Sequence, residues 1–305
     1  MKKKLFTALA VGSAVFFSSC GTQNVETTAV TTVSETTSFV QATEETTTSR
    51  QTETSEESEF EQTLTYLCKG YFKEDSSGSS VPDPDYLPLP DFKEIPANSV
   101  FDVMWGTVEG SYMAGTSFLM KMEEQNDPLL ITAIHYFGDS ISGSDLPGYI
   151  NGGELYDILK DGSEPDGIVS GVIPIADAVG FGAAETGEKD VAAFTVSDTS
   201  GMNSFSPASG TCQPGDMIYL ATYLSDENTY YYDDCLYPCV VISDDGTNLY
   251  YLLHDMFIAT GASGAPLLNK DGEVVGIHIA SANSVRYGHS IQSICEQLET
   301  ALEGQ

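Results

Sequence analysis

The sequence predicts an antiparallel all-β protein, and three observations support this class. From about Leu64 onward, short segments rich in β-branched and aromatic residues alternate with Gly, Asp, Asn or Pro. The chain has no repeat of fixed period and no alternation of strands with helices of the kind that builds parallel sheets. Only two segments have a helical pattern. The chain beyond Leu64 is long enough for one two-lobed domain with a sizeable core.

The expected elements follow one another in a simple order. Strands are predicted over residues 101–110, 115–122, 129–137, 168–175, 190–196, 216–224, 239–253 and 273–280. A brief amphipathic helical turn is predicted over 153–160, between the third and fourth of these strands. A longer helix is predicted over 290–303, where Ser290 can cap the first turn and one face is apolar: Ile291, Ile294, Leu298 and Leu302.

The amino terminus predicts export. Three lysines are followed by an apolar run that ends at Phe17 and by two serines before Cys20, which is the pattern of a secretion signal. It resembles a bacterial lipoprotein signal, in which the cysteine is lipidated and becomes the first mature residue. A plain cleaved signal peptide is the alternative. The apolar run is too short to span a bilayer, so we expect a lipid anchor on the outer face of a bacterial membrane.

Composition divides the chain into segments. Residues 1–19 are the expected signal peptide, and residues 20–63 are the lipidated cysteine and a Thr/Ser/Glu-rich tether that cannot bury enough apolar surface to fold. Residues 64–99 form a proline-rich, extended lead-in. The folded part divides at about Gly201, into residues 100–200 and 201–305.

Charge and cysteine content exclude several functions. A formal net charge of −33 argues against nucleic acid as a partner, because phosphates are repelled. The acidic stretches 231–235 and 243–246 lack a calcium-ligand spacing that we recognise and fit a solvated acidic face better. Six cysteines less Cys20 leave an odd number, and their pairing is not decided by the sequence. We expect no metal or cofactor. We also expect a monomer, although no sequence feature decides the oligomeric state.

Three residues form a candidate catalytic set. Ser263 is flanked by Gly261 and Gly264, which suits either a tight hairpin bend or a loop that crowds backbone N–H groups around a reacting oxygen. A serine nucleophile needs a histidine base and a carboxylate to orient it. His135, at the end of an apolar strand, and Asp190, at the start of another, precede Ser263 in the order His, Asp, Ser.

These motifs resemble those of chymotrypsin-superfamily, trypsin-like serine peptidases of the bacterial branch. "GASGAP" is similar to the nucleophile loop, "ITAIH" to the base motif, "KDVAAF" to the strand of the aspartate, and "GTSFLM" to the strand before the histidine. The resemblance implies two antiparallel Greek-key β-barrels with a C-terminal helix. It implies a serine endopeptidase in which Ser263 is the nucleophile, His135 the base and Asp190 the orienting carboxylate. The N–H groups of Gly261 and Ser263 would form the oxyanion hole.

The chain departs from the family at Ala262. Many animal members carry an aspartate there, which pairs with the amino terminus freed by activation cleavage. We therefore expect no activation of that kind, and a loop organised by its own packing. Ala265, where a second small residue such as Gly or Ser is usual, is a milder change.

The resemblance also assigns a substrate-binding region. Ile258 and Thr260 should line the primary pocket, and a substrate backbone should pair with the strand that carries Ile279, Ala280 and Ser281. His278 stands where related glutamyl endopeptidases bind an acidic side chain. The sequence does not decide whether this chain has that preference.

Two other functions are alternatives to a trypsin-like serine peptidase. An α/β-hydrolase needs the order Ser, Asp, His and a glycine where Ala265 stands, so it fails. A catalytically inactive trypsin-like fold that acts as a surface binding module is the alternative from another class of function.

Overall fold

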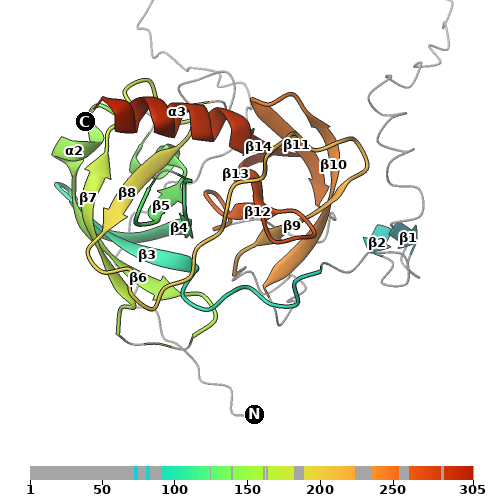
Figure 1. Ribbon diagram of the computed structural model, residues 1–305, viewed down its shortest axis with the longest axis horizontal. Coiled ribbons are helices and arrows are strands. Elements are labelled where there is room, and N and C mark those ends of the chain that lie inside the picture. The colour runs from blue at the N-terminus through green and yellow to red at the C-terminus, as the bar shows by residue number, and fades with distance from the viewer. Residues whose placement is uncertain are drawn as a thin grey trace, which may run out of the picture. The chain divides into compact units, whose positions relative to one another are not determined.

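The computed structural model describes residues 72–74, 80–82, 91–123, 125–138, 140–160, 162, 164–181, 189–223, 235–253, 261–282 and 285–304. Within this part the chain forms two closed antiparallel β-barrels and a C-terminal helix (Figure 1), which confirms the predicted all-β, two-barrel fold class. The signal peptide, Cys20, the tether, Ile258 and Thr260 lie outside the described residues.

The two barrels have the same strand order. The first is closed in the order β3-β4-β5-β8-β7-β6 and the second in the order β9-β10-β11-β14-β13-β12. The strands of the first are β3 (Val100–Thr107), β4 (Gly110–Met120), β5 (Leu129–Thr132), β6 (Ile150–Asp157), β7 (Gly167–Ile173) and β8 (Ala192–Val196). Those of the second are β9 (Met217–Ala221), β10 (Leu236–Asp244), β11 (Asn248–Leu253), β12 (Pro266–Leu268), β13 (Val274–Ala282) and β14 (Val285–Ser290).

Three short elements complete the description. β1 (Phe72–Glu74) and β2 (Ser80–Pro82) form a two-stranded antiparallel sheet ahead of the barrels in the chain. A 3₁₀ turn, η1 (Ile134–Phe137), follows β5, and α2 (Leu146–Tyr149) leads into β6.

Each barrel is filled by large apolar side chains. In the first, Trp105 is fully buried and its ring lies 5.0 Å from that of Phe137 and 4.7 Å from that of Phe194, measured between centroids. In the second, Tyr251 and Leu249 are buried among the inward-facing residues of the neighbouring strands. Burial of this much apolar surface is the main force that holds the barrels closed.

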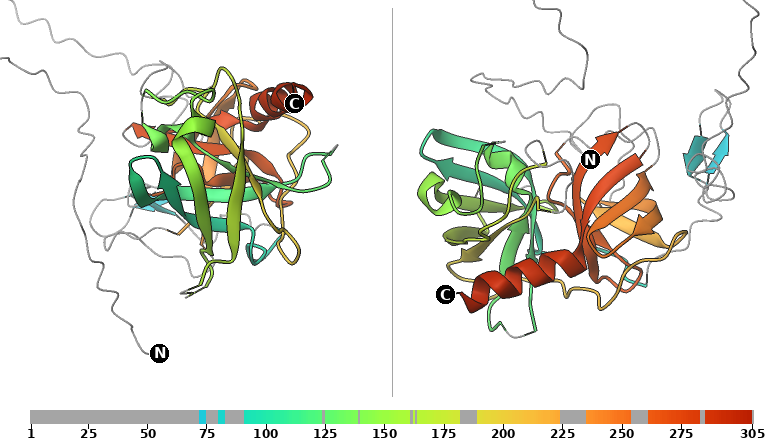
Figure 2. Two further views of the ribbon diagram at one scale, coloured as in Figure 1. Left: turned by 90° about the vertical axis from the view of Figure 1, so that its left-hand side faces the viewer. Right: turned by 90° about the horizontal axis from the view of Figure 1, so that it is seen from above.

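The helix α3 (Ile291–Glu303) runs across both barrels, as the view from above shows (Figure 2). It packs against β13 and β14 of the second barrel. Its buried residues, Ile291, Ile294 and Leu298, belong to the hydrophobic core that contains the residues of the first barrel. The helix therefore contacts both barrels. Ser290 takes the N-cap position, but its side chain makes no capping hydrogen bond.

Three secondary-structure predictions are wrong. The segment 239–253 is not one strand, because it contains parts of β10 and β11, which pair with each other as a hairpin. Residues 153–160 do not form a helical turn, because residues 153–157 belong to β6, which pairs with β3 on one side and β7 on the other. Leu155 points inward and Glu154 outward, as in a strand. The strand expected over 129–137 ends at Thr132, and η1 carries the chain out of the barrel wall.

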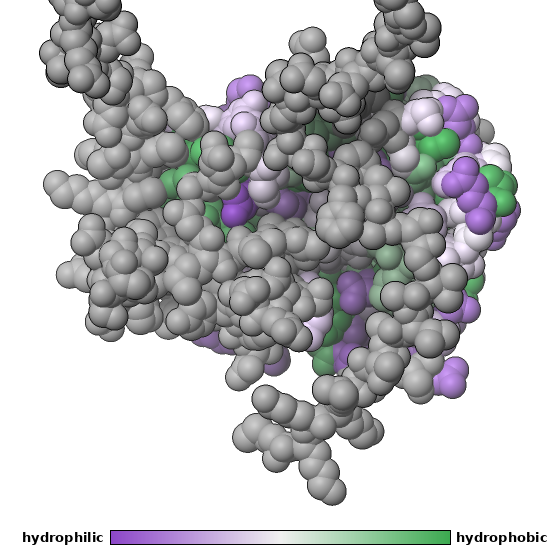
Figure 3. All heavy atoms as spheres, turned by 180° about the vertical axis from the view of Figure 1, so that it is seen from behind, coloured by the Kyte–Doolittle hydropathy of each residue, from purple (hydrophilic) through white to green (hydrophobic). Residues whose placement is uncertain are grey.

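The described surface has no large apolar face in view. Seen from behind, hydrophobic and hydrophilic residues are mixed wherever grey atoms do not cover them (Figure 3). The large apolar side chains that are exposed come from separate strands and loops: Val108, Met113, Leu159, Ile168 and Tyr223. Among the described residues, no helix has the length and apolar character needed to cross a bilayer.

Candidate active site

His135 lies on η1, three residues after the end of β5. Its Nδ1 is 2.7 Å from Oδ2 of Asp190, and 23% of its side chain is exposed. The turn places the ring outside the barrel wall, so that one nitrogen contacts the carboxylate and the other is left for a partner. In this arrangement Nδ1–H donates to Asp190, and Nε2 is the basic atom.

Asp190 is fully buried and its carboxylate is held at both oxygens. Oδ1 accepts a hydrogen bond from the backbone N–H of His135 at 3.0 Å. Oδ2 accepts one from the backbone N–H of Phe181 at 2.9 Å, in addition to the ring of His135. Asp177, the other carboxylate in an apolar stretch between His135 and Ser263, is 62% exposed and faces Lys189. The geometry therefore favours Asp190 as the carboxylate partner of the histidine.

Ser263 lies in the turn that leads into β12. Its hydroxyl donates to the carbonyl of Ile279 at 3.1 Å. The described residues show no hydrogen bond between Ser263 and His135, so in this state the hydroxyl is engaged elsewhere. The two residues are nevertheless neighbours, because the hydroxyl of Tyr136, next to His135, donates to the Ser263 carbonyl. Catalytic hydrogen bonds are often absent or long until substrate binds.

The glycines around the serine have a steric reason. Gly264 has φ +74, and a Cβ there would lie 2.3 Å from Oγ1 of Thr132 and 2.4 Å from the carbonyl oxygen of Thr116. Gly261 has φ +89, which L side chains rarely adopt. The sequence left a hairpin bend and a catalytic loop as two explanations. The close approach of the first barrel to Gly264 is what requires the glycine at that position.

Two backbone N–H groups of the turn that carries the serine have no acceptor among the described residues. The N–H groups of Gly261 and Ser263 donate no hydrogen bond within the described part of the chain, whereas Gly264 donates to His278 and Ala265 to Ala262. These are the two groups expected to form an oxyanion hole. Donors that converge beside a nucleophile can stabilise the negative oxygen of a tetrahedral intermediate.

The expected substrate strand has one open edge. Ile279, Ala280 and Ser281 lie on β13, which pairs with β14 along this stretch. The partners of β12 on β13 end at Ile277, so no described strand covers the other edge of residues 279–281. Ile279 falls at a bulge and is buried, whereas Ser281 is exposed. An extended peptide can add to such an edge.

His278 is 2% exposed and its Nδ1 is 2.6 Å from the Tyr251 hydroxyl. Its Nε2 has no hydrogen-bond partner among the described residues. Burial, and then the nearby charges of Arg286 and His135, lower the pKa of His278 to about 3. The ring is therefore neutral at physiological pH and can contact a substrate side chain by a hydrogen bond rather than by an ion pair.

Sequence reasoning missed two residues of this region, Thr116 and Tyr136. Both donate hydrogen bonds to carbonyl groups of the turn around Ser263. The expectation that this turn is organised by its own packing is therefore incomplete, because residues of the first barrel also hold it.

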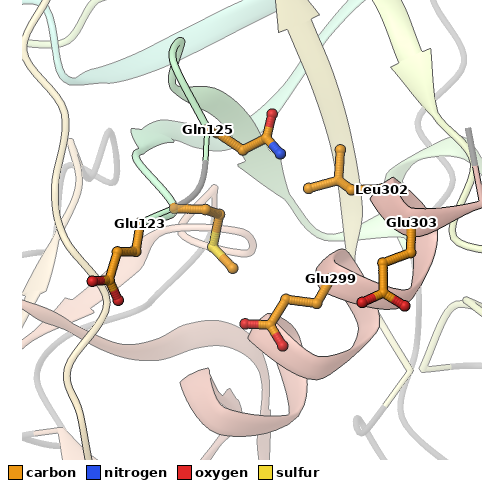
Figure 4. Close-up of a pocket in the computed structure, with 6 residues that line it drawn as sticks. Glu123, Gln125, Glu299, Leu302 and Glu303 are labelled. Carbon is orange, nitrogen blue, oxygen red and sulfur yellow. The ribbon is translucent and has the colours of Figure 1, made fainter.

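The described residues contain no cluster of His, Cys, Asp and Glu that could hold a metal ion. A hollow of about 370 Å³ lies at the end of α3, lined by Met122, Glu123, Gln125, Glu299, Leu302 and Glu303 (Figure 4). None of the candidate catalytic residues lines it.

The cysteines of the described region are placed as structural residues. Cys212, Cys239 and Cys295 form no disulfide, so the closest pair in the sequence, Cys235 with Cys239, is not bridged. Burial raises the pKa of the Cys239 thiol to about 12 and that of Cys295 to about 11. Thiols with such values stay protonated at neutral pH and are poor nucleophiles.

A comparison with known protein families matches the part of the chain that contains the candidate catalytic residues. A family model described as "Trypsin-like peptidase domain" matches residues 115–277, which include His135, Asp190 and Ser263. No curated protein matches the chain.

Solved structures with this fold are distant in sequence. A thermostable serine protease, AL20, from an extremophilic microorganism is 12% identical, with a TM-score of 0.47, over 68% of this chain and 98% of that chain. A Glu endopeptidase in complex with MPD is 16% identical, with a TM-score of 0.47, over 70% of this chain and 96% of that chain. A serine endoprotease from Yersinia pestis is 14% identical, with a TM-score of 0.46, over 68% of this chain, and the chain covers 64% of that protein.

Proposed function

Because the chain belongs to the family of trypsin-like peptidase domains, we propose that it is a serine endopeptidase that works through His135, Asp190 and Ser263. The observation that carries the proposal is the contact of 2.7 Å between Nδ1 of His135 and the fully buried carboxylate of Asp190. A carboxylate held in this way fixes the histidine tautomer and stabilises the imidazolium that catalysis creates.

The proposed reaction proceeds in two halves. The Ser263 hydroxyl leaves the Ile279 carbonyl, gives its proton to Nε2 of His135 and attacks the carbonyl carbon of the scissile bond. The negative oxygen of the tetrahedral intermediate accepts hydrogen bonds from the N–H groups of Gly261 and Ser263. His135 then gives the proton to the departing amine, which leaves an acyl-enzyme. A water molecule, deprotonated by His135, releases the acid and restores the serine.

The substrate is proposed to be an extended peptide or protein segment. Its backbone would pair with the open edge of residues 279–281, and its primary side chain would enter the region of Ile258, Thr260 and His278. Because His278 is neutral at physiological pH, a preference for an acidic side chain would need a hydrogen bond from this ring. A peptide library would determine the preference directly.

The proposed location is the outer face of a bacterial membrane. The support is the amino-terminal pattern that ends at Cys20 and the Thr/Ser/Glu-rich segment after it. Lipidation of Cys20 would anchor the chain, and the tether would hold the peptidase away from the membrane surface.

A fluorophosphonate probe tests the catalytic proposal. We expect the folded protein to be labelled at Ser263, and the Ser263→Ala variant to remain unlabelled and to lose peptide hydrolysis. If the wild-type protein is not labelled and hydrolyses no member of a peptide library, the inactive binding module is the better explanation.

A further inference from the structure

The turn around Ser263, which we call the nucleophile loop (Gly261–Ala265), is held by two residues of the first barrel. The N–H of Thr116, on β4, donates to the Ser263 carbonyl at 3.0 Å. The hydroxyl of Tyr136, on η1, donates to the same carbonyl at 2.5 Å. The hydroxyl of Thr116 donates to the Gly261 carbonyl at 2.9 Å. The carbonyls of Gly261 and Ser263 therefore face the first barrel.

The bonds to the Gly261 and Ser263 carbonyls hold the peptide units 261–262 and 263–264, which flank the unit that carries the Ser263 N–H. A peptide unit is planar and trans, so its C=O and N–H point in opposite directions. The unit between Ser263 and Gly264 is bound at both ends, with its carbonyl at the first barrel and its N–H on the His278 carbonyl at 2.7 Å. The Ala262 carbonyl of the preceding unit accepts from the N–H of Ala265 at 2.8 Å. The Ser263 N–H of that unit therefore points the other way, and it has no acceptor among the described residues.

Tyr136 is built into its position. A Cβ on Gly115 would lie 1.8 Å from an atom of its ring, and Gly115 has φ +60, so the glycine leaves the space that the ring fills. The ring centroid is 4.8 Å from that of His135. Burial raises the pKa of the Tyr136 hydroxyl well above its usual value, so the group remains a hydrogen-bond donor at physiological pH. Tyr136 thus packs beside His135 and donates a hydrogen bond to the carbonyl of Ser263.

Thr116 is fully buried and fully bonded. Its hydroxyl has one proton, which it gives to the Gly261 carbonyl, so the Thr222 hydroxyl, 2.8 Å away, must be the donor in the contact between the two threonines. The carbonyl of Thr116 accepts from the Thr132 hydroxyl at 2.9 Å. A valine of similar size would remove the bond to Gly261 and leave the fold of β4 in place.

We propose that the hydroxyl groups of Tyr136 and Thr116 are positioning groups that hold the nucleophile loop in its reactive geometry from the first barrel. This inference rests on the proposed peptidase function. The peptide units that they hold, 261–262 and 263–264, lie on either side of the unit that carries the Ser263 N–H. Their effect is on the transition state, because the Ser263 N–H, which these flanking units keep in place, binds the oxygen only when it becomes negative.

The test compares two variants with a matched control. Tyr136→Phe and Thr116→Val each remove one hydroxyl, and Tyr112→Phe removes a hydroxyl that donates to the backbone carbonyl of Tyr136, at 3.1 Å, and makes no bond to the nucleophile loop within the described residues. We expect kcat to fall about tenfold in each test variant, with KM changed by less than about twofold. Binding of a peptide aldehyde, whose adduct places an oxyanion in the hole, should weaken by a similar factor. Tyr112→Phe should match the wild-type protein.

The outcomes separate this inference from the proposed function. If the single variant Ser263→Ala keeps the peptide-hydrolysing activity of the wild-type protein, the proposed serine peptidase function is refuted. Ser263-dependent activity that is unchanged in both test variants would overturn only the positioning role. An equal rise of KM in Tyr136→Phe and Tyr112→Phe, with kcat unchanged, would indicate a structural effect of the η1 region and would also overturn it. If one test variant does not fold, the other carries the measurement.

Discussion

At the scale of single residues, the Asp190 carboxylate is ordered before any substrate arrives. Its two oxygens accept three hydrogen bonds, two of them from backbone N–H groups that cannot move away without unfolding η1 or the segment at Phe181. In the proposed reaction, little reorganisation would then be needed when His135 becomes charged. Preorganised polar groups of this kind are the main source of rate enhancement in many enzymes.

Asp190→Asn should therefore impair catalysis without unfolding the protein. An asparagine presents an NH₂ group to atoms that all donate, so it favours the wrong tautomer of His135. The corresponding change in a related enzyme lowers kcat about 10⁴-fold, and we expect a loss that approaches this value in steady-state peptide hydrolysis. Asp177→Asn, at an exposed site, is the control and should leave kcat unchanged. A near-wild-type rate for Asp190→Asn would remove this residue from the triad.

Asp102, on β3, gives a prediction about stability. Burial raises the pKa of its carboxyl group to about 6, so the folded state binds this proton more tightly than the unfolded chain does. The stabilisation is fully present below pH 3.8 and is lost as the pH rises through 6. The side chain in Asp102→Asn stays neutral. At pH 7.5 the unfolding free energy of this variant should exceed that of the wild-type protein by roughly 1 to 3 kcal/mol, and thermal unfolding should occur at a higher temperature. At pH 3.5 the advantage should vanish, and an equal advantage at both pH values would contradict the explanation.

At the scale of elements, the outcome of each prediction depends on how much of the signal is local. The helix α3 was predictable because Ile291, Ile294 and Leu298 recur with helical spacing, and all three are buried. β6 was not, because Leu155 and its neighbours suit either period and the decision came from pairing with β3 and β7. The end of β5 at Thr132 could not be predicted, because apolar residues continue into η1.

The candidate site divides in the same way. The order of His135, Asp190 and Ser263 could be found from motifs in the sequence. The roles of Thr116 and Tyr136 could not, because each depends on a hydroxyl meeting a carbonyl that is 145 or 127 residues away. Such contacts depend on the way the two barrels pack together, which a local pattern does not record.

The attachment of α3 to β14 should depend on pH. Nε2 of His289, on β14, lies 3.1 Å from the Gln297 side-chain nitrogen and 3.1 Å from the Ser293 hydroxyl, both on α3. The amide donates, so Nε2 must be unprotonated. Burial is the main cause that lowers the pKa of His289 to about 4. The stabilisation is therefore present above pH 6.5 and is lost as the pH falls toward 4.

His289→Gln should weaken that dependence. Between pH 7.5 and pH 4.5 the wild-type protein should lose roughly 2 kcal/mol more unfolding free energy than the variant, as measured by thermal or urea unfolding. Asp102 has the opposite dependence over part of this range in both proteins, so the comparison is between variants rather than between pH values of one protein. Parallel curves for the two proteins would show that His289 does not titrate in this way.

At the scale of the whole molecule, the sequence joins an acidic, folded peptidase domain to an amino-terminal segment of different composition. The formal net charge of −33 on the whole chain repels anionic polymers and attracts cationic segments at long range. The proposed anchor would confine the activity to the volume that the tether allows. The location of the protein would then restrict its substrates as much as the proposed substrate-binding region does.

Cys20→Ala tests this arrangement. If Cys20 carries the anchor, the wild-type protein should partition into detergent and yield an acylated amino-terminal peptide by mass spectrometry, because stable anchoring takes more than one acyl chain. The variant should be released or incorrectly processed, while purified protein of both kinds should label equally with a fluorophosphonate. Membrane attachment that survives the substitution would refute the lipid anchor.

The hydrogen bonds from Thr116 and Tyr136 to the nucleophile loop also bear on when activity arises during biosynthesis. His135 and Asp190 precede Ser263 in the chain and leave the ribosome first. The bonds between the nucleophile loop and the first barrel join residues more than a hundred positions apart, so we expect them to form after the second barrel has closed. We therefore expect catalytic competence to appear at the last stage of folding, with no cut in the chain. An exported polypeptide that is still threading through a translocation channel would be inert, and the completion of folding on the far side would act as its maturation step.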